Sequence, residues 1–460
     1  MLNRRDFFKA GLGLTATALF PFNQAESRQL ISEYCIDDGY KYLLKSINSV
    51  IHEYYDLHGK VSLSTDLAML YAKRQYHQET IETLNKAVEL AQNSYPIRLF
   101  CAFMESAKSY SIINEHVLAD KAISNAREAL PKISKGLFSL YPEYLISIAR
   151  ICCEKNENNR AILLLDKAYE LSAEGLLFPL DNRLLVELAE AYSDIGLLKK
   201  AEDAANKIIP VYKTYNIYGS YVYCSDIDRV GATAYVAGRY AEMGSTKRAY
   251  ELLNEINQQT KTKSKEIITA YAKLKEWEKA MSLTAAEEES EFFLINCPYL
   301  VITKHAVSAG RGDVAADALN KMARAVENNN DSLYWRIPES IIETADVFLL
   351  LGDDDNAIKY LKYAVEKSQA LLEDGGSMFY PTDLAKAGAV WLKMGNISEG
   401  VGLLHEALEH IITQNDDFLK GSSLINIAEI FFNSNIAIKE KEKELLRRIV
   451  DSCEGENYDI

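Results

Sequence analysis

Histidine side chains supply many catalytic bases and metal ligands, and in this chain they are scattered. The seven histidines are His52, His58, His77, His116, His305, His405 and His410. No two of them lie three or four residues apart, the spacing at which one helix face presents a pair of ligands to zinc. A lone H-x-E begins at His77, but the P-C-x-x-C half of the zinc-deaminase signature is missing. The sequence therefore predicts no metal ligands.

The cysteines do not indicate a disulfide framework. Their count is seven, an odd number, and they are widely spread along the chain. Cys152 and Cys153 are adjacent, which does not match the C-x-x-C spacing of redox and zinc sites. A chain that folds in a reducing cytosol keeps its thiols free, and free thiols are what we expect here.

Two short motifs have simple explanations as turns. Gly310-Arg311-Gly312-Asp313 matches cell-adhesion ligands, but it lies between two expected helices, where a turn is needed. The acidic run 353–355 could hold calcium, but the twelve-residue loop with its closing Glu is absent. Acids also suit a helix start, where they meet the positive end of the helix dipole. There is no G-x-S-x-G, P-loop or dinucleotide fingerprint, so we expect no catalytic residues and no cofactor.

The N-terminus has the three-part plan of an export signal, with a basic start, a weakly apolar middle and small residues near residue 25. Arg4, Arg5, Phe7 and Lys9 together resemble the twin-arginine translocation signal. That resemblance implies that residues 1–25 are a signal peptide, read by the twin-arginine translocon, which exports a folded protein. The expected location is the bacterial periplasm or cell envelope, with the protein anchored if the signal is not cleaved. The alternative is a cytosolic protein whose N-terminal helix only mimics a signal.

The composition is that of a folded protein with an acidic surface. Hydrophobic residues make up 48% of the 460 residues, charged residues 25%, and the formal net charge is −15. Such a charge repels phosphate backbones, and no basic stripe offsets it, so we expect no nucleic-acid partner. No stretch approaches the roughly 20 apolar residues that a membrane-spanning helix needs.

One pattern recurs along most of the chain. A small residue is followed by a bulky residue three later, often a Gly four further on, and then an Ala that begins a second periodic segment. The clearest copies start at Ala189, Ala237, Ala345 and Gly388, and weaker copies start at Ala68 and Ala149. The small residue of the second segment recurs with a mean spacing of about 40 residues. Offsets of three and four place these residues on one helix face, and the Gly supplies the left-handed turn between two helices.

This arrangement of small, Tyr, Gly and Ala positions resembles the tetratricopeptide repeat family, although the period is longer than the usual 34 residues. The resemblance implies an all-α solenoid, a right-handed superhelix of stacked helical hairpins. We expect N-terminal capping helices at 26–60, a repeat array at 61–435, and a C-terminal capping helix and tail at 436–460. Each cap would hide the apolar face of a terminal repeat.

In tetratricopeptide arrays the first helix of each pair lines a concave groove that holds peptides or partner helices. By register, the resemblance assigns Met69, Arg150, Glu190, Lys304 and Asp346 to that groove. The most economical hypothesis is an exported, non-enzymatic scaffold that binds a protein or peptide. Two alternatives stay open, namely a hydrolase or a metal- or cofactor-dependent enzyme built into the solenoid, and a cytosolic regulator.

Overall fold

The computed structural model describes residues 36–54, 56–133, 140–173, 182–208, 214–215, 221–222, 227–259, 265–286, 298–328, 337–373 and 379–453. Within these ranges the chain is built almost entirely from α-helices, with one 3-10 turn, η1 (Leu130–Lys132), and one short β-ribbon. The predicted all-α solenoid of stacked helical hairpins is confirmed. The predicted signal residues Arg4, Arg5, Phe7 and Lys9 lie outside the described residues.

After α3 (Ile36–Glu53), the described helices pair into ten consecutive hairpins. The first helix of each hairpin lies on the inside of the fold: α4 (Leu57–Lys73), α6 (Pro96–Ile112), α8 (Leu140–Glu154), α10 (Asn182–Asp194), α12 (Ile227–Glu242), α14 (Lys265–Lys273), α17 (Pro298–Ser308), α19 (Ile337–Leu350), α21 (Tyr380–Lys393) and α23 (Asp417–Asn433). The second lies outside: α5 (His77–Gln92), α7 (His116–Ala129), α9 (Asn158–Ala173), α11 (Leu198–Asn206), α13 (Thr246–Gln259), α15 (Trp277–Ala285), α18 (Gly312–Asn328), α20 (Asp354–Glu373), α22 (Ile397–Ile412) and α24 (Glu440–Asp451).

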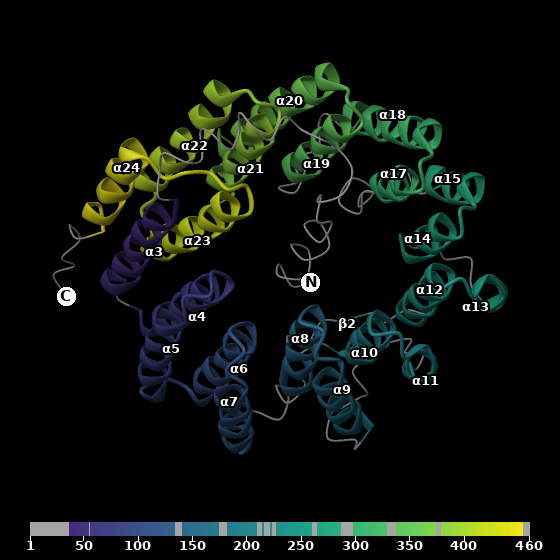
Figure 1. Ribbon diagram of the computed structural model, residues 1–460, viewed down its shortest axis with the longest axis horizontal. Helices are drawn as coiled ribbons and strands as arrows, with labels where there is room; N and C mark the ends of the chain where they lie inside the picture. The colour runs from purple at the N-terminus through teal and green to yellow at the C-terminus, as the bar shows by residue number, and fades with distance from the viewer. Residues whose placement is uncertain are drawn as a thin grey trace.

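The array closes into a ring (Figure 1). Helix α3 packs against α23 and α24, and α4 packs against α23, so the two ends of the array meet. We call this contact between α3–α4 and α23–α24 the seam. The two segments expected to cap opposite ends of a superhelix therefore cover each other's apolar faces. The boundary expected after residue 435 falls between α23 and α24, which are the two helices of the tenth hairpin.

Each hairpin turns at one residue with a left-handed backbone. The sequence predicted glycine in this role, and Gly196, Gly244, Gly352 and Gly395 have φ between 76° and 79°. Where the repeat lacks glycine, Asn or another polar residue takes the same conformation, as Asn156 does with φ 62°. The left-handed turn is common to all ten described hairpins, whereas glycine is not. Repeats without the glycine therefore still form hairpins.

Small residues sit where the two helices of a hairpin approach closely. Ala189 and Ala201, which face each other in the α10–α11 hairpin, are both 0% exposed. In the α21–α22 hairpin both positions are glycine. A Cβ on Gly388 would lie 2.8 Å from the Gly400 carbonyl oxygen, and one on Gly400 would lie 2.9 Å from the Gly388 carbonyl oxygen. These two backbones are too close for any side chain.

The buried apolar residues form two main clusters. One runs continuously through the array from Ala68 to Trp391, because each hairpin buries its apolar face on the next. The other fills the seam and contains Tyr40, Ile47, Leu424 and Ile449. Helices α4 and α21 contribute to both clusters, and so join the seam to the array.

Two details of the array lie outside the clear copies of the repeat. In the second hairpin the left-handed residue is Asn114, which places Ala119 in the alanine position of the repeat. The link before α12 contains an antiparallel ribbon of β1 (Thr214–Tyr215) and β2 (Tyr221–Val222).

None of the helices in the described residues is both long enough and apolar enough to cross a membrane.

Candidate functional site

The ten inner helices form the inner wall of the ring, and the five predicted groove residues all lie on these helices. Met69 is on α4 and partly exposed. The other four are charged, and each reaches across to a neighbouring inner helix. Arg150 and Glu190 pair with each other at 3.1 Å. Lys304 pairs with Glu343 at 3.4 Å, and Asp346 with Lys393 at 2.8 Å.

The Arg150–Glu190 pair belongs to a polar network that bridges four consecutive inner helices, α8, α10, α12 and α14. After the Arg150–Glu190 pair, the Tyr235 hydroxyl donates a 2.8 Å hydrogen bond to Asp194. Lys273 then pairs with Glu242 at 3.0 Å. We call this set the inner-wall network.

Arg239 joins α12 to the end of α10. Its guanidinium donates to the backbone carbonyls of Ser193 at 3.3 Å and Asp194 at 3.2 Å. These carbonyls belong to the last turn of α10, where the Ser193 carbonyl also accepts from the backbone N–H of Gly196 at 3.0 Å. Arg239, on the first helix of one hairpin, therefore caps the C-terminal end of the first helix of the previous hairpin.

Burial sets the electrostatics of the network. It raises the pKa of Glu190 to about 7; Arg150 opposes this shift, and Glu266, Asp194 and Glu187 add to it. The pKa of Tyr235 is also raised, first by burial and then by Asp194. The pKa of His305 is lowered by burial and by the neighbouring Lys273. Near neutral pH Glu190 therefore carries less negative charge than an ordinary carboxylate.

The opposite part of the wall, from α17 to α21, is bridged in the same way. Lys386 on α21 reaches Glu339 on α19 at 2.5 Å. Below this pair Asp383 is buried and accepts a 2.8 Å hydrogen bond from Ser368. Burial raises the pKa of Asp383 to about 7, and Lys386 opposes the shift.

The inner wall of the described residues is polar. The exposed large apolar residues are Tyr95, Val117, Leu163, Met243, Leu350 and Ile397. They lie on outer helices or at the ends of helices and links, away from the bridging pairs. A wall of this kind suits a hydrophilic partner better than an apolar small molecule.

Sequence reasoning missed most members of the inner-wall network, including Asp194, Tyr235, Arg239 and Lys273. A signal for some of them was present. Arg150 and Glu190 have opposite charges and are separated by one repeat period, and Lys304 and Glu343 are separated by 39 residues. Opposite charges one period apart on first helices predict a bridge between neighbours.

The other motifs of the sequence have structural roles in the described residues. Arg311 donates to the Asp313 carboxylate at 2.8 and 2.6 Å. The two charged side chains of the adhesion-like tetrapeptide therefore bind each other. Asp353 accepts from the backbone N–H of Asn356 at 3.2 Å and caps α20. Among the described cysteines, Cys152, Cys153 and Cys453 are free thiols. No group of three or more potential metal ligands occurs among the described residues.

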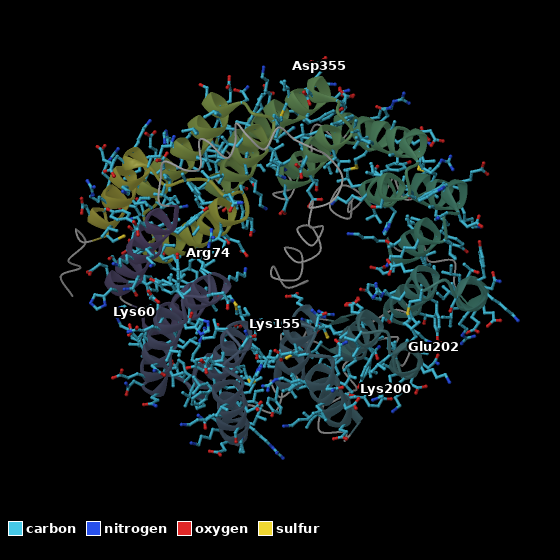
Figure 2. All side chains as sticks on the ribbon, in the orientation of Figure 1. Lys60, Arg74, Lys155, Lys200, Glu202 and Asp355 are labelled. Carbon is cyan, nitrogen blue, oxygen red and sulfur yellow. The ribbon has the colours of Figure 1, made fainter. Side chains whose placement is uncertain are left out.

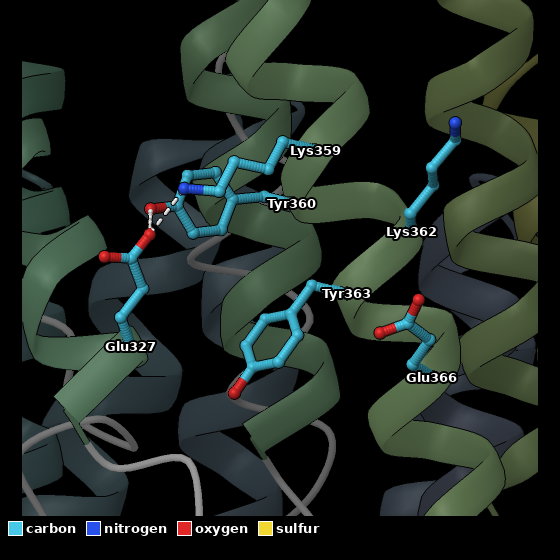
Figure 3. Close-up of a pocket in the computed structure, with 6 residues that line it drawn as sticks. All are labelled: Glu327, Lys359, Tyr360, Lys362, Tyr363 and Glu366. Carbon is cyan, nitrogen blue, oxygen red and sulfur yellow. Dashed lines mark hydrogen bonds and ion pairs between the residues drawn. The ribbon is translucent and has the colours of Figure 1, made fainter.

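A hollow lies on the outside of the ring, between α18 and α20 (Figure 3). Glu327 there accepts hydrogen bonds from Lys359 at 2.6 Å and from the Tyr360 hydroxyl at 3.0 Å. The remaining lining residues are Lys362, Tyr363 and Glu366. The paired charges and the open shape give no built ligand site.

The chain matches no protein-family model and no curated protein sequence. Among solved structures it is similar to the human IFIT1 dimer with m7Gppp-AAAA, at 14% identity over 81% of this chain and 95% of that chain, with a TM-score of 0.26. It is also similar to the apo form of the quorum sensor NprR from B. thuringiensis, at 12% identity over 86% and 99%, with a TM-score of 0.27. A circular tandem repeat protein is similar at 14% identity over 89% and 96%, with a TM-score of 0.21. Scores this low carry no functional argument to this chain.

Proposed function

We propose that the protein is a non-enzymatic scaffold that binds a hydrophilic protein or peptide on the inner wall of its ring. One observation carries this proposal. The inner helices present a polar, mixed-charge wall, whereas every exposed large apolar residue in the described part of the chain lies elsewhere. A partner that exchanges hydrogen bonds and ion pairs with such a wall can be held without a deep apolar pocket.

The binding energy would come from a few anchors rather than from the whole wall. Arg150 and Arg239 are the guanidinium groups of the inner-wall network, and Tyr235 is its partly buried aromatic side chain. These residue types dominate measured binding hot spots. The region from α8 to α14 is therefore where we place the main contact.

A site-specific photocrosslinker tests the proposal. We would replace Met69 on the inner wall, or Leu163 on the outer helix α9, with a benzoylphenylalanine residue in the native host. Met69 is partly exposed and Leu163 is 71% exposed, so both positions accept the probe. We expect a discrete crosslinked partner from position 69 and none from position 163.

Charge reversal on the wall sharpens the result. Lys304→Glu should weaken the position 69 crosslink, whereas Lys86→Glu, on the outer helix α5, should not. Crosslinks that are equal at positions 69 and 163, or that are unaffected by Lys304→Glu, would contradict inner-wall binding.

We also propose that the protein is exported folded through the twin-arginine route. Arg4-Arg5 followed by Phe7 and Lys9 supports this. Replacing Arg4 and Arg5 together by Lys should move the protein from the periplasmic to the cytosolic fraction. A distribution that is unchanged by this replacement would favour a cytosolic scaffold instead.

A further inference from the structure

The ten left-handed turns lie along one edge of the ring, which we call the turn rim. The inner helices all point toward the same edge of the ring, and each of them ends at its turn. The turns therefore share one edge of the ring, and the links between hairpins share the other. Contacts between successive turns agree with this. Lys155, after α8, donates to Asn114 of the previous turn at 2.6 Å, and His116 lies 3.3 Å from Glu157 of the next turn.

One sector of the turn rim is basic. At the α10–α11 and α12–α13 turns, Lys199 and Lys247 are exposed, and neither forms a salt bridge with any described residue. Their neighbours Lys200 and Arg248 are occupied by Asp166 and Glu202. Figure 2 shows Lys200 and Glu202 on the same side of the ring.

A second sector, at the α19–α20 turn, is acidic. Asp353 is used as the cap of α20, but Asp354 and Asp355 are exposed, and their carboxylates have no hydrogen-bond or salt-bridge partner in the described part of the chain. Figure 2 places Asp355 on a different side of the ring from Lys200. The two sectors therefore cannot neutralise each other within one molecule.

Each sector also carries one exposed large apolar side chain beside its turn. Met243 is 58% exposed and precedes Gly244 in the basic sector. Leu350 is 55% exposed and precedes Gly352 by two residues in the acidic sector. Each sector thus presents one exposed apolar side chain, and the two sectors have opposite charges.

We propose that the turn rim binds a second copy of this chain, rim to rim, about a two-fold axis that lies in the plane of the rim. A two-fold contact is self-complementary, so the basic sector of one copy meets the acidic sector of the other twice. Lys199 and Lys247 then face Asp354 and Asp355 of the second copy, and Met243 faces Leu350. This contact is independent of any partner on the inner wall.

The charge of the whole molecule gives this dimer a recognisable salt dependence. Two copies with a net charge of −15 repel each other, and added salt weakens that repulsion. Contact between complementary sectors responds in the opposite way, because salt screens the attraction between exposed opposite charges. A dimer held as proposed should dissociate between 50 mM and 500 mM NaCl. An apolar association elsewhere on the surface should strengthen with salt.

Charge-reversal complementation tests the proposal. Sedimentation velocity on the full chain would compare the wild type with an all-acidic variant, Lys199→Glu/Lys247→Glu, and an all-basic variant, Asp354→Lys/Asp355→Lys. Each variant alone should dimerise at least about tenfold more weakly than the wild type, because like charges then meet across both contacts. An equimolar mixture should form heterodimers, since both contacts again join opposite charges.

The control for the all-acidic variant is Lys86→Glu/Lys362→Glu, which changes the net charge equally on the outer helices α5 and α20. It should dimerise as the wild type does. The proposal is overturned if the wild type is monomeric at 100 µM in 50 mM NaCl, or if it dimerises but the two rim variants do so equally well. It is also overturned if each variant is weakened but their mixture does not recover.

Discussion

At an ordinary junction between hairpins, the contacts join residues that are close in sequence. Asp166 on α9 accepts a 2.8 Å hydrogen bond from the Tyr192 hydroxyl, which is 26 residues away in the sequence. The same carboxylate forms a 2.6 Å ion pair with Lys200, which is 34 residues away. The next junction repeats this arrangement with Glu202, Tyr240 and Arg248. At these two junctions the tyrosine of the repeat therefore does more than fill space, since its hydroxyl joins its hairpin to an acid of the previous one.

At the seam, the contacts join opposite ends of the chain. The Tyr40 hydroxyl donates a 2.6 Å hydrogen bond to the Phe431 carbonyl, across 391 residues. The Arg74 guanidinium stacks on the Phe432 ring at 3.3 Å and on the Tyr40 ring at 4.2 Å, and Lys73 pairs with Glu429.

The difference teaches which part of the ring depends on the rest. An ordinary junction can form as soon as two neighbouring hairpins have folded. Forming the seam costs loop-closure entropy, which grows with the length of chain between the two ends. The contacts of the seam offset this entropy only if all the intervening hairpins are in place. We therefore expect the seam to open before the array unfolds.

The largest expected effect comes from a buried charge in each region. Ile47 in the seam and Ile148 in α8 are both 0% exposed. Ile47→Asp and Ile148→Asp should each cost several kcal/mol, because an unpaired carboxylate is buried. Hydrogen exchange should show Ile47→Asp deprotecting α3, α23 and α24 while α8–α15 stay protected. Ile148→Asp should deprotect the array around α8. Global unfolding by Ile47→Asp would show that the seam is not a separate unit.

A pH effect is expected where the seam meets the array. The pKa of Asp383 is about 7 in the folded protein because of burial, against roughly 3.9 in the unfolded chain. The folded state thus binds the proton more tightly, and the resulting stability is present below about pH 4 and is lost as the pH rises through 7. Asp383→Asn removes this dependence and can still accept from Ser368. The melting temperature of the variant minus that of the wild type should rise between pH 4 and 7; a constant difference would contradict burial of a neutral Asp383.

A pair of glycine substitutions separates close packing from helix propensity. Gly388→Ala places a Cβ 2.8 Å from the Gly400 carbonyl oxygen, and we expect a loss of about 1–3 kcal/mol from overpacking. Gly402→Ala, in the same hairpin, meets nothing within 4 Å and should stabilise the protein by about 0.5–1 kcal/mol. Urea denaturation measures both changes. Equal signs for the two substitutions would contradict the close approach of α21 and α22.

The smallest effects are expected from single hydroxyl groups. Tyr192→Phe removes the donor to Asp166 at an ordinary junction, and Tyr40→Phe removes the donor to the Phe431 carbonyl at the seam. Each should cost about 1–2 kcal/mol, with the bond to the carboxylate the stronger. Hydrogen exchange should localise the first loss to α9–α11 and the second to α3 and α23. If both substitutions deprotect the same helices, the two regions are not distinct.

Much of the fold could be predicted from the sequence because it is local. The spacing of Ala189, Tyr192 and Gly196 specifies two helix faces and a left-handed turn within one hairpin. Ring closure could not be predicted, because it depends on the small rotation between each hairpin and the next, summed over the whole array. No periodic signal joins Tyr40 to Phe431. The register placed Arg150 and Glu190 on first helices, but that they bridge neighbours follows only once the hairpins are stacked.

The most direct test of the closed ring is a zero-length crosslink. Carbodiimide joins a lysine to a carboxylate only when the two are in contact, and Lys73 of α4 contacts Glu429 of α23 only if the ring is closed. Mass spectrometry of the monomer fraction should find this crosslink alongside Lys393–Asp346, which serves as the positive control from an ordinary junction, with its ion pair at 2.8 Å. The Lys73–Glu429 crosslink should disappear in Glu429→Gln. A monomer that yields the Lys393–Asp346 crosslink but never the Lys73–Glu429 crosslink would contradict the ring.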